Sequence, residues 1–148
     1  MDGDLVSMEL KFKLMVSDRP WEHEPDNEEW IDEATGYKCA VWRHPTHGSL
    51  NGYVTIPSGH PLYGQSYDVI NHFVEVHGGL TYSADDGTVG FDCNHAEDFA
   101  PKMVMNLMKY VDSDVRHHLH ETYRDWAYVK AEVEKLAQQL KQLEVKEK

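Results

Sequence analysis

Hydrophobic and polar residues first alternate regularly at residues 8–16, where apolar side chains occupy every second position. A period of two is typical of a half-buried β-strand, and the lysines in this run suit the edge of a sheet. Shorter apolar runs predict strands at residues 37–43, 53–56 and 88–93. A fourth strand in chain order is expected over residues 73–76 and 80–82, interrupted by Gly78 and Gly79 as in a β-bulge. These runs predict an antiparallel sheet of about five short strands.

The pattern changes to a helical one after residue 98. Residues 101–111 predict a short helix that begins at Pro101. A much longer helix is expected to start at Ser113 or Asp114 and to run to about residue 143. Its apolar residues follow a spacing of three and four: Trp126, Val129, Val133, Leu136, Leu140 and Leu143. Such a seam must pack on something, so the helix either lies across the sheet or forms a coiled-coil homodimer with a second chain.

Together these elements predict an α+β fold. Residues 1–112 would form the α+β core, and residues 113–148 would form the long C-terminal helix that packs on the core or dimerises. Within the core, residues 20–33 carry seven acidic residues, and their prolines exclude a continuous helix. We therefore expect an acidic loop at residues 20–33 that Trp21 and Trp30 pin to the core.

The charge balance of the chain restricts its partners. The formal net charge is -12, from 26 acidic and 14 basic residues. This charge opposes non-specific binding to DNA or RNA, but it is compatible with a protein that imitates DNA. No apolar run reaches the length of a membrane span, and the N-terminus lacks the pattern of a secretory signal. Two cysteines give no disulfide framework, so we expect a cytoplasmic protein.

Side chains suited to acid–base or metal chemistry concentrate at residues 75–98. The motif HGGLTY begins at His77, and its two glycines let backbone amides approach a ligand. Asp92, His95 and Asp98 follow at the end of a predicted strand, where loops often carry functional sites. Imidazoles and carboxylates together suit zinc or manganese, with His77, His95 and Asp98 as ligands, or general acid–base catalysis. The full predicted ligand-binding set is His60, Tyr63, His77, Gly78, Gly79, Tyr82, Asp92, His95 and Asp98.

Each of these features also has a structural explanation. A histidine in a strand is more often a hydrogen-bonded core residue than a ligand, and the GHPLYG turn around His60 serves equally well as a rigid turn. Cys93 is more often a small buried residue than a nucleophile. His117, His118 and His120 lack metal-ligand spacing and fit the solvated face of a helix. Strong zinc signatures are absent.

Five blocks of sequence resemble a family of small uncharacterised proteins carried by bacteriophages and prophages. They occur in the order EPDNEEWIDEATGYKC, GYVTIPSGHPLYG, VHGGLTY, GFDCNHAED and YRDWAYVKAEVEKLA. The resemblance covers roughly residues 21–140, and Asn51 stands where the family often has a cysteine. It implies no activity, but it does imply a phage or prophage accessory protein, expressed in the bacterial cytoplasm, with a role in countering host defence.

Three functions are compatible with these observations. The first, which the sequence favours, is binding of a small polar, nucleotide-like ligand, for example to sequester a host signalling nucleotide. Backbone amides and imidazoles would contact the phosphate, and Tyr63, Tyr82 or Trp42 would stack on the base. Because the chain is acidic, this function needs a local basic patch formed by Arg43, His60 and His77.

The second function is a metal-dependent hydrolase. His77, His95 and Asp98 would bind the metal, and Asp92 would orient or activate water. The third is an acidic interaction protein that masks a host DNA-binding enzyme through residues 22–33. The third function does not require His77 or His95, which separates it from the other two.

Overall fold

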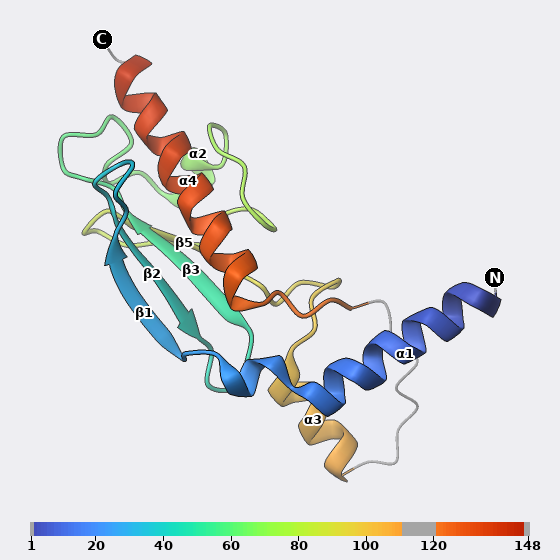
Figure 1. The fold of residues 1–148 in the computed structure, drawn as a ribbon. Helices are drawn as coiled ribbons and strands as arrows, with labels where there is room; N and C mark the ends of the chain where they lie inside the picture. Colours follow the sequence, from blue (N-terminus) through green and yellow to red (C-terminus); the bar gives the residue numbers. More distant parts are fainter. Residues whose placement is uncertain (1, 111–120, 147–148) are drawn as a thin grey trace.

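Five short antiparallel strands form one sheet in the order β1-β2-β3-β5-β4 (Figure 1). Their bounds are β1 Asn27–Ile31, β2 Lys38–Arg43, β3 Leu50–Thr55, β4 Tyr82–Ser83 and β5 Thr88–Asp92. The computed structural model describes residues 2–110 and 121–146. Its helices are α1 Asp2–Asp18, the 3-10 helix η1 Pro20–His23, α2 Tyr67–Ile70, α3 Pro101–Tyr110 and α4 Trp126–Lys146. The predicted α+β fold, with a sheet of about five strands and a long C-terminal helix, is confirmed.

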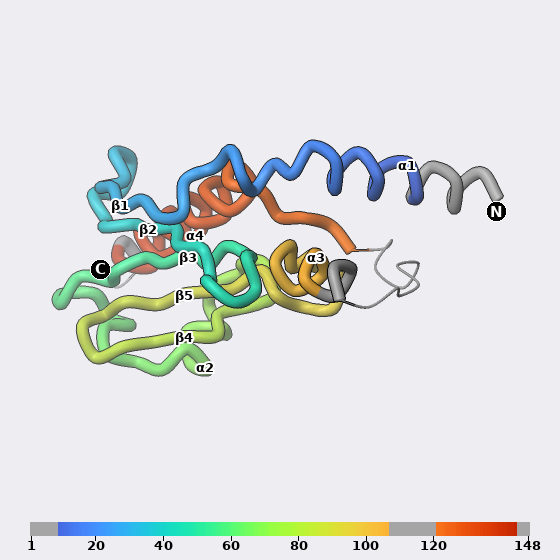
Figure 2. Tube along the Cα trace, turned by 90° about the horizontal axis from the view of Figure 1, so that it is seen from below, coloured from blue at the N-terminus to red at the C-terminus, as the bar shows by residue number. Residues whose placement is uncertain are grey.

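The first element of the chain is a helix, so the strand predicted at residues 8–16 is wrong. Phe12 is buried in α1 and Met15 and Val16 pack beside it, which is the three-to-four spacing of one helix face. Leu10 and Leu14 remain 57% and 60% exposed. The alternating pattern places apolar residues all around α1, and its Leu, Met, Lys and Glu residues favour a helix. Figure 2 shows that α1 projects away from the sheet.

Two further parts of the sheet differ from the prediction. Residues 73–76 form no strand, and Gly78 and Gly79 lie in a turn with φ angles of 67° and 80° rather than in a β-bulge. Instead, part of the expected acidic loop forms β1, the edge strand that pairs with β2. Trp21 and Trp30 nevertheless pack on the core as expected, Trp21 in η1 and Trp30 in β1.

The apolar seam of α4 lies across the sheet, on the side that we call the inner face. Val129, Val133, Leu136 and Leu140 are completely buried there against β2 and β3. The helix approaches β3 so closely that a Cβ on Gly52 would lie 2.5 Å from a methyl group of Val133. The sheet therefore covers the seam from which a homodimer was predicted.

The helix begins later than expected. Residues 123–125 are not helical, and α4 starts at Trp126. Asp125 caps it, because its carboxylate accepts a hydrogen bond from the Tyr128 amide at 2.9 Å. A carboxylate oxygen of Glu24 accepts a second bond, from the Trp126 amide at 3.1 Å. The predicted start at Ser113 or Asp114 lies outside the described residues, as do the three histidines at 117, 118 and 120.

Helix α3 begins at Pro101, as predicted, and lies beyond one end of the sheet together with α1 (Figures 1 and 2). A second hydrophobic cluster joins α1, η1 and α3 to the segment before α4. Its buried members are Phe12, Trp21, Phe99, Val104 and Tyr123. The backbone of residues 97–99 also pairs with Thr122, since the Phe99 amide donates to the Thr122 carbonyl at 2.8 Å and the Thr122 amide donates to the Glu97 carbonyl at 2.8 Å. This pairing brings residues 92–98 beside the first turn of α4.

Candidate functional site

The carboxylate of Asp98 is the centre of a polar cluster between β5 and α4. Its side chain is only 1% exposed. His77 Nε2 lies 3.0 and 2.9 Å from its two oxygens, Arg124 Nε donates to Oδ1 at 2.8 Å, and the His95 amide donates to Oδ2 at 3.1 Å. Burial opposes ionisation of Asp98, but the hydrogen bonds from His77 and Arg124 outweigh it and hold the pKa of this carboxyl below its usual value.

The ring of His77 connects Asp98 to Tyr128. A carboxylate only accepts hydrogen bonds, so His77 Nε2 carries the proton that faces Asp98. In the neutral imidazole, Nδ1 then accepts a bond from the Tyr128 hydroxyl, 2.8 Å away. Desolvation, followed by the charge of Glu132, raises the pKa of Tyr128, so its hydroxyl keeps its proton at neutral pH. The Glu132 carboxylate also accepts a bond from the His77 amide at 2.8 Å, which fixes the turn of the HGG motif on α4.

Arg124 contacts Asp98 and Tyr128, and the rest of its guanidinium has no partner among the described residues. Its Nε binds Asp98, and its guanidinium lies 5.2 Å from the centre of the Tyr128 ring. The side chain is 24% exposed. Its two terminal Nη groups make no hydrogen bond to any described residue. An arginine that is fixed through Nε presents its remaining donors as a planar fork, which matches the oxygen pairs of carboxylates and phosphates.

His95 and Asp92 form the outer part of the cluster. His95 Nε2 lies 2.9 Å from an oxygen of Asp92, at the distance of an ion pair. The angles are not those of a hydrogen bond, and Nε2 has no hydrogen-bond partner among the described residues. A Cβ on Gly78 would lie only 2.3 Å from this nitrogen. Gly78 is therefore needed for the close approach of His95 as well as for its own positive φ.

A cavity of about 270 Å³ adjoins this cluster on the side of α3. Its walls include Asn94, His95, Asp98 and Met103. Binding pockets for small molecules usually have about 300–1,000 Å³. The cavity therefore has room for a small polar group but not for a whole nucleotide.

The structure joins five of the predicted site residues, His77, Gly78, Asp92, His95 and Asp98, and separates His60, Tyr63 and Tyr82 from them. His60 binds the Leu140 carbonyl, twelve residues beyond Tyr128 and hence about 18 Å further along α4. Tyr82 contacts Tyr53 on the opposite face of the sheet. The ring of Tyr63 lies beside Gly87, in the turn before β5. A single pocket that includes His60, Tyr63 and Tyr82 is therefore not formed.

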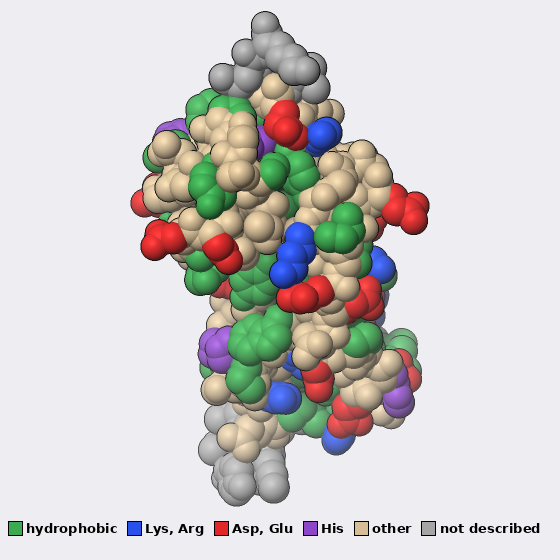
Figure 3. All heavy atoms as spheres, turned by 90° about the vertical axis from the view of Figure 1, so that its left-hand side faces the viewer, with side chains coloured by type: hydrophobic (Ala, Val, Ile, Leu, Met, Phe, Trp, Pro, Cys, Tyr) green, Lys and Arg blue, Asp and Glu red, His purple; other side chains and the backbone are tan. Residues whose placement is uncertain are grey.

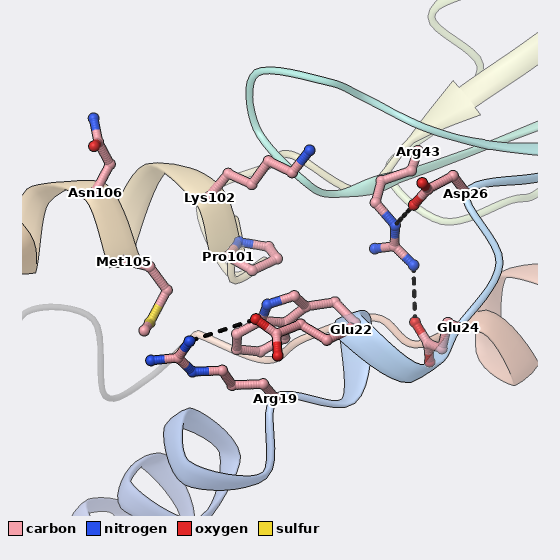
Figure 4. Close-up of a pocket in the computed structure, with 10 residues that line it drawn as sticks. Arg19, Glu22, Glu24, Asp26, Arg43, Pro101, Lys102, Met105 and Asn106 are labelled. Carbon is pink, nitrogen blue, oxygen red and sulfur yellow. Dashed lines mark hydrogen bonds and ion pairs between the residues drawn. The ribbon is translucent and has the colours of Figure 1, made fainter.

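Arg43 does not supply the basic patch that the sequence required. Its side chain is 4% exposed and all five of its N–H donors are used. Nε donates to Asp26 at 3.1 Å, Nη1 to the Gly48 carbonyl and the Tyr123 hydroxyl, and Nη2 to Glu24 and the Pro25 carbonyl. Figure 4 shows Arg43 between Asp26 and Glu24 at one end of a cavity of about 810 Å³. At the other end Arg19 pairs with Glu22 at 3.4 Å.

Two further predictions concern metal and thiol chemistry. Among the described residues, no three His, Cys, Asp or Glu side chains converge as metal ligands. Both ring nitrogens of His77 already have partners, Asp98 and Tyr128. Cys93 is buried, and burial together with the charge of Asp98 raises the pKa of its thiol. It is therefore the small buried residue that the sequence favoured over a nucleophile.

Sequence reasoning missed Arg124, Tyr128 and Glu132. They belong to the YRDWAYVKAEVEKLA block and lie outside the apolar seam: Arg124 precedes α4, and Tyr128 and Glu132 each stand one position before a seam valine. Their partners lie 26 to 55 positions away in the chain. The pairing of residues 97–99 with Thr122 and the packing of α4 on the sheet bring them together, and no periodicity in the sequence indicates this pairing.

Comparison with known proteins adds no homologue to these observations. The chain matches no protein-family model, no curated protein and no solved structure. In the described part of the chain, no helix has the length and apolar character needed to cross a membrane.

Proposed function

We propose that this protein binds a small anionic ligand, with a phosphate or carboxylate group held by the fork of Arg124. The observation that supports this function is the fixed position of Arg124 together with the hydrogen bonds that its terminal groups lack. Asp98 and Tyr128 fix the guanidinium in place, while its terminal donors have no partner in the described part of the chain. Holding the fork in advance lowers the entropy that binding costs. The ring of Tyr128 lies beside the guanidinium, and the His95 amide binds the same carboxylate as Arg124 does.

The hydrogen bond between His77 and Tyr128 restricts what this tyrosine can offer a ligand. Because the Tyr128 hydroxyl donates to His77 Nδ1, its proton is not available to the ligand. The terminal donors of Arg124 are therefore the groups that would bind the anion.

A nucleotide is the ligand class that best fits the phage-protein resemblance. Sequestration of a host signalling nucleotide would counter host defence, as the sequence predicted. Arg124 does not line the cavity beside His95, so the anionic group would be held by the exposed part of Arg124 rather than inside that cavity.

The test is ligand-induced stabilisation of the purified protein. Inorganic phosphate, mononucleotides and cyclic dinucleotides are titrated while Tm is followed, because a ligand of the folded state stabilises it by RT ln(1 + [L]/Kd). Arg124→Gln should reduce the affinity about 10- to 100-fold, the range for losing hydrogen bonds to a charged group. Arg19→Gln, which changes an exposed arginine at the far cavity, is the matched control. Equal shifts in both variants, or no shift with any of these ligands, would refute the proposal.

The metal-dependent hydrolase remains an alternative prediction. For His77 to bind a metal, one of its ring nitrogens would have to lose its hydrogen bond to Asp98 or to Tyr128. For that reason we favour the hydrolase less. Elemental analysis separates the two functions. Stoichiometric zinc or manganese that is lost in His95→Ala would favour the hydrolase, whereas metal-free protein that still binds an anion would favour the binding function.

A further inference from the structure

The side of the sheet opposite α4, which we call the outer face, carries none of the helices in residues 2–110 and 121–146. Its side chains form cross-strand rows, because residues that are paired in register point to the same side. One row runs from Glu29 through Ala40, Tyr53 and Gly90 to Tyr82. Trp42 stands in the next row, opposite Asn51. Trp42 is 39% exposed and Tyr82 is 47% exposed.

Small residues among these aromatic rings leave the outer face hollow. Ala40 and Gly90 lie on either side of Tyr53 in the same row. A Cβ on Gly90 would lie 2.5 Å from the Tyr53 ring, so this ring lies directly over the glycine backbone. Tyr82 packs edge-on against Tyr53, with ring centres 5.8 Å apart. The resulting hollow has a volume of about 790 Å³, which is within the usual range of binding sites.

The charges around the hollow favour a cationic occupant. The carboxylates of Glu29 and Asp86 line it, against a single base, Lys38. Glu28 also borders the hollow, but its carboxylate pairs with Lys130 of α4 at 3.4 Å on the inner face. Lys38 lies 3.9 Å from Glu29, and both side chains are more than half exposed, so this ion pair is weak and readily exchanged. The whole chain carries a net charge of -12, which adds a long-range attraction for cations. Exposed aromatic faces next to carboxylates are suited to the guanidinium and ammonium groups of Arg and Lys.

From this geometry we infer that the outer face binds an extended basic segment of a partner protein, with Arg or Lys side chains stacked on Trp42 and Tyr82. These residues belong to β2 and β4, which are three strand spacings apart, or about 14 Å. They also lie in neighbouring rows, about 7 Å apart along the strands, so their backbones are about 16 Å apart. In an extended segment, side chains at positions i and i+4 point the same way and start about 13 Å apart, and the length of Arg or Lys side chains covers the difference. The partner segment therefore carries its two cations four residues apart. The inference does not depend on the ligand proposed at Arg124.

Single-stranded nucleic acid is the competing occupant, since bases also stack on the aromatic residues of open sheets. Such sites combine aromatic residues with a positively charged groove for the phosphates. The hollow has the opposite charge. An oligonucleotide is therefore expected to be repelled. If it binds more tightly than the basic peptide, the inference is wrong.

A synthetic peptide with Arg at positions i and i+4 and neutral residues elsewhere is the probe. Binding to the full chain is followed by tryptophan fluorescence and by calorimetry. The same peptide with citrulline in place of both arginines tests the charge, because citrulline keeps the shape but is neutral. We expect saturable binding of the arginine peptide and a loss of at least tenfold in affinity for the citrulline peptide.

Variants of exposed residues locate the binding without disturbing the core. Trp42→Ala and Glu29→Gln should each weaken peptide binding about tenfold. Phe73→Ala is the matched control, since Phe73 is 54% exposed and outside the strands, and it should bind like the wild type. Arg124→Gln should also bind the peptide normally, so failure of the ligand proposal and failure of this one are distinguishable. Unchanged binding in Trp42→Ala, equal binding of the citrulline peptide, no saturable binding, or tighter binding of an oligonucleotide would overturn the inference.

Discussion

His60 Nε2 donates a hydrogen bond to the carbonyl oxygen of Leu140 at 2.7 Å. The donor is identified by the other ring nitrogen, Nδ1, which accepts a bond from the Leu62 amide at 2.9 Å. One buried imidazole thus satisfies both the turn in which it lies and a helix 80 residues further along the chain. A residue that the sequence placed among the ligands contributes to the fold instead.

His60→Ala should therefore lower stability and leave ligand binding intact. The substitution leaves the Leu62 amide without its side-chain acceptor and opens a cavity beside α4, which we expect to cost about 2 kcal/mol. Urea unfolding followed by circular dichroism measures the loss. The peptide and nucleotide titrations should give wild-type affinities for the folded variant. Full stability combined with lost binding would return His60 to the ligand set.

Asp98 should make stability depend on pH in the acid range. Its pKa in the folded protein is lower than in the unfolded chain, so the folded state binds fewer protons. Its stabilising effect is therefore complete above the unfolded pKa of about 3.9 and is lost as the pH falls through the folded pKa. We expect Asp98→Asn to cost about 3 kcal/mol at pH 7, because it leaves Arg124 without its buried partner.

The same variant provides the control for this pH dependence. The stability difference between the wild type and Asp98→Asn should shrink as the pH is lowered below about 4. Unfolding free energies measured by urea titration between neutral and acid pH test it. A difference that stays constant across the range would contradict the assignment of an ionised Asp98.

Gly52→Ala should be strongly destabilising, although alanine is small. The new Cβ would lie 2.5 Å from Val133 and from the Phe91 ring, both of which are in the core. Either α4 or the ring must move, and we expect a cost of about 1–3 kcal/mol. Gly59→Ala is the matched control, because nothing lies within 4 Å of its Cβ position and its φ is not positive. Similar denaturant midpoints for the two variants would mean that α4 and β3 are not in close contact.

The two cysteines should react with thiol reagents only after unfolding. Both are free and buried. Burial, with a contribution from the charge of Asp32, raises the pKa of Cys39 to about 12, and burial also raises that of Cys93. Because the thiolate is the reactive form, labelling by a chromogenic disulfide at pH 8 should be slow in buffer and rapid in denaturant. Equal rates under the two conditions would show that at least one thiol is accessible.

The elements that were predicted correctly are those in which the spacing of apolar residues matches the face that is buried. The strands around Val41, Val54 and Val89 combine β-branched residues with an inner face that is fully buried. The seam of α4 was predicted for the same reason. Periodicity failed in α1, where alternating apolar residues also satisfy a helix that is covered on only part of its surface. It also failed in β1, an edge strand that directs only Trp30 toward the core and otherwise resembles a polar loop.

The candidate site was predictable only as far as it is local in sequence. Asp92, His95 and Asp98 lie within seven residues, so a turn after a strand was enough to group them. His77 was grouped with them because imidazoles and carboxylates concentrate at residues 75–98, but its direct hydrogen bond to Asp98 was not predicted. Arg124 and Tyr128 could not be assigned, since the length and start of α4 determine which of its residues reach the cluster.

The way in which α4 is attached has a consequence for synthesis of the protein. The helix provides the carbonyl that His60 binds, the carboxylate that the His77 amide binds, and the amide that Glu24 caps. Glu24, His77 and His60 therefore meet these partners only after residues 126, 132 and 140, respectively, have been translated. Until then the buried face of the sheet, including Val41, Leu50 and Val54, has no cover. Folding of the core must accordingly follow translation of α4, and a ribosome that stalls before this helix would leave a nascent chain dependent on chaperones.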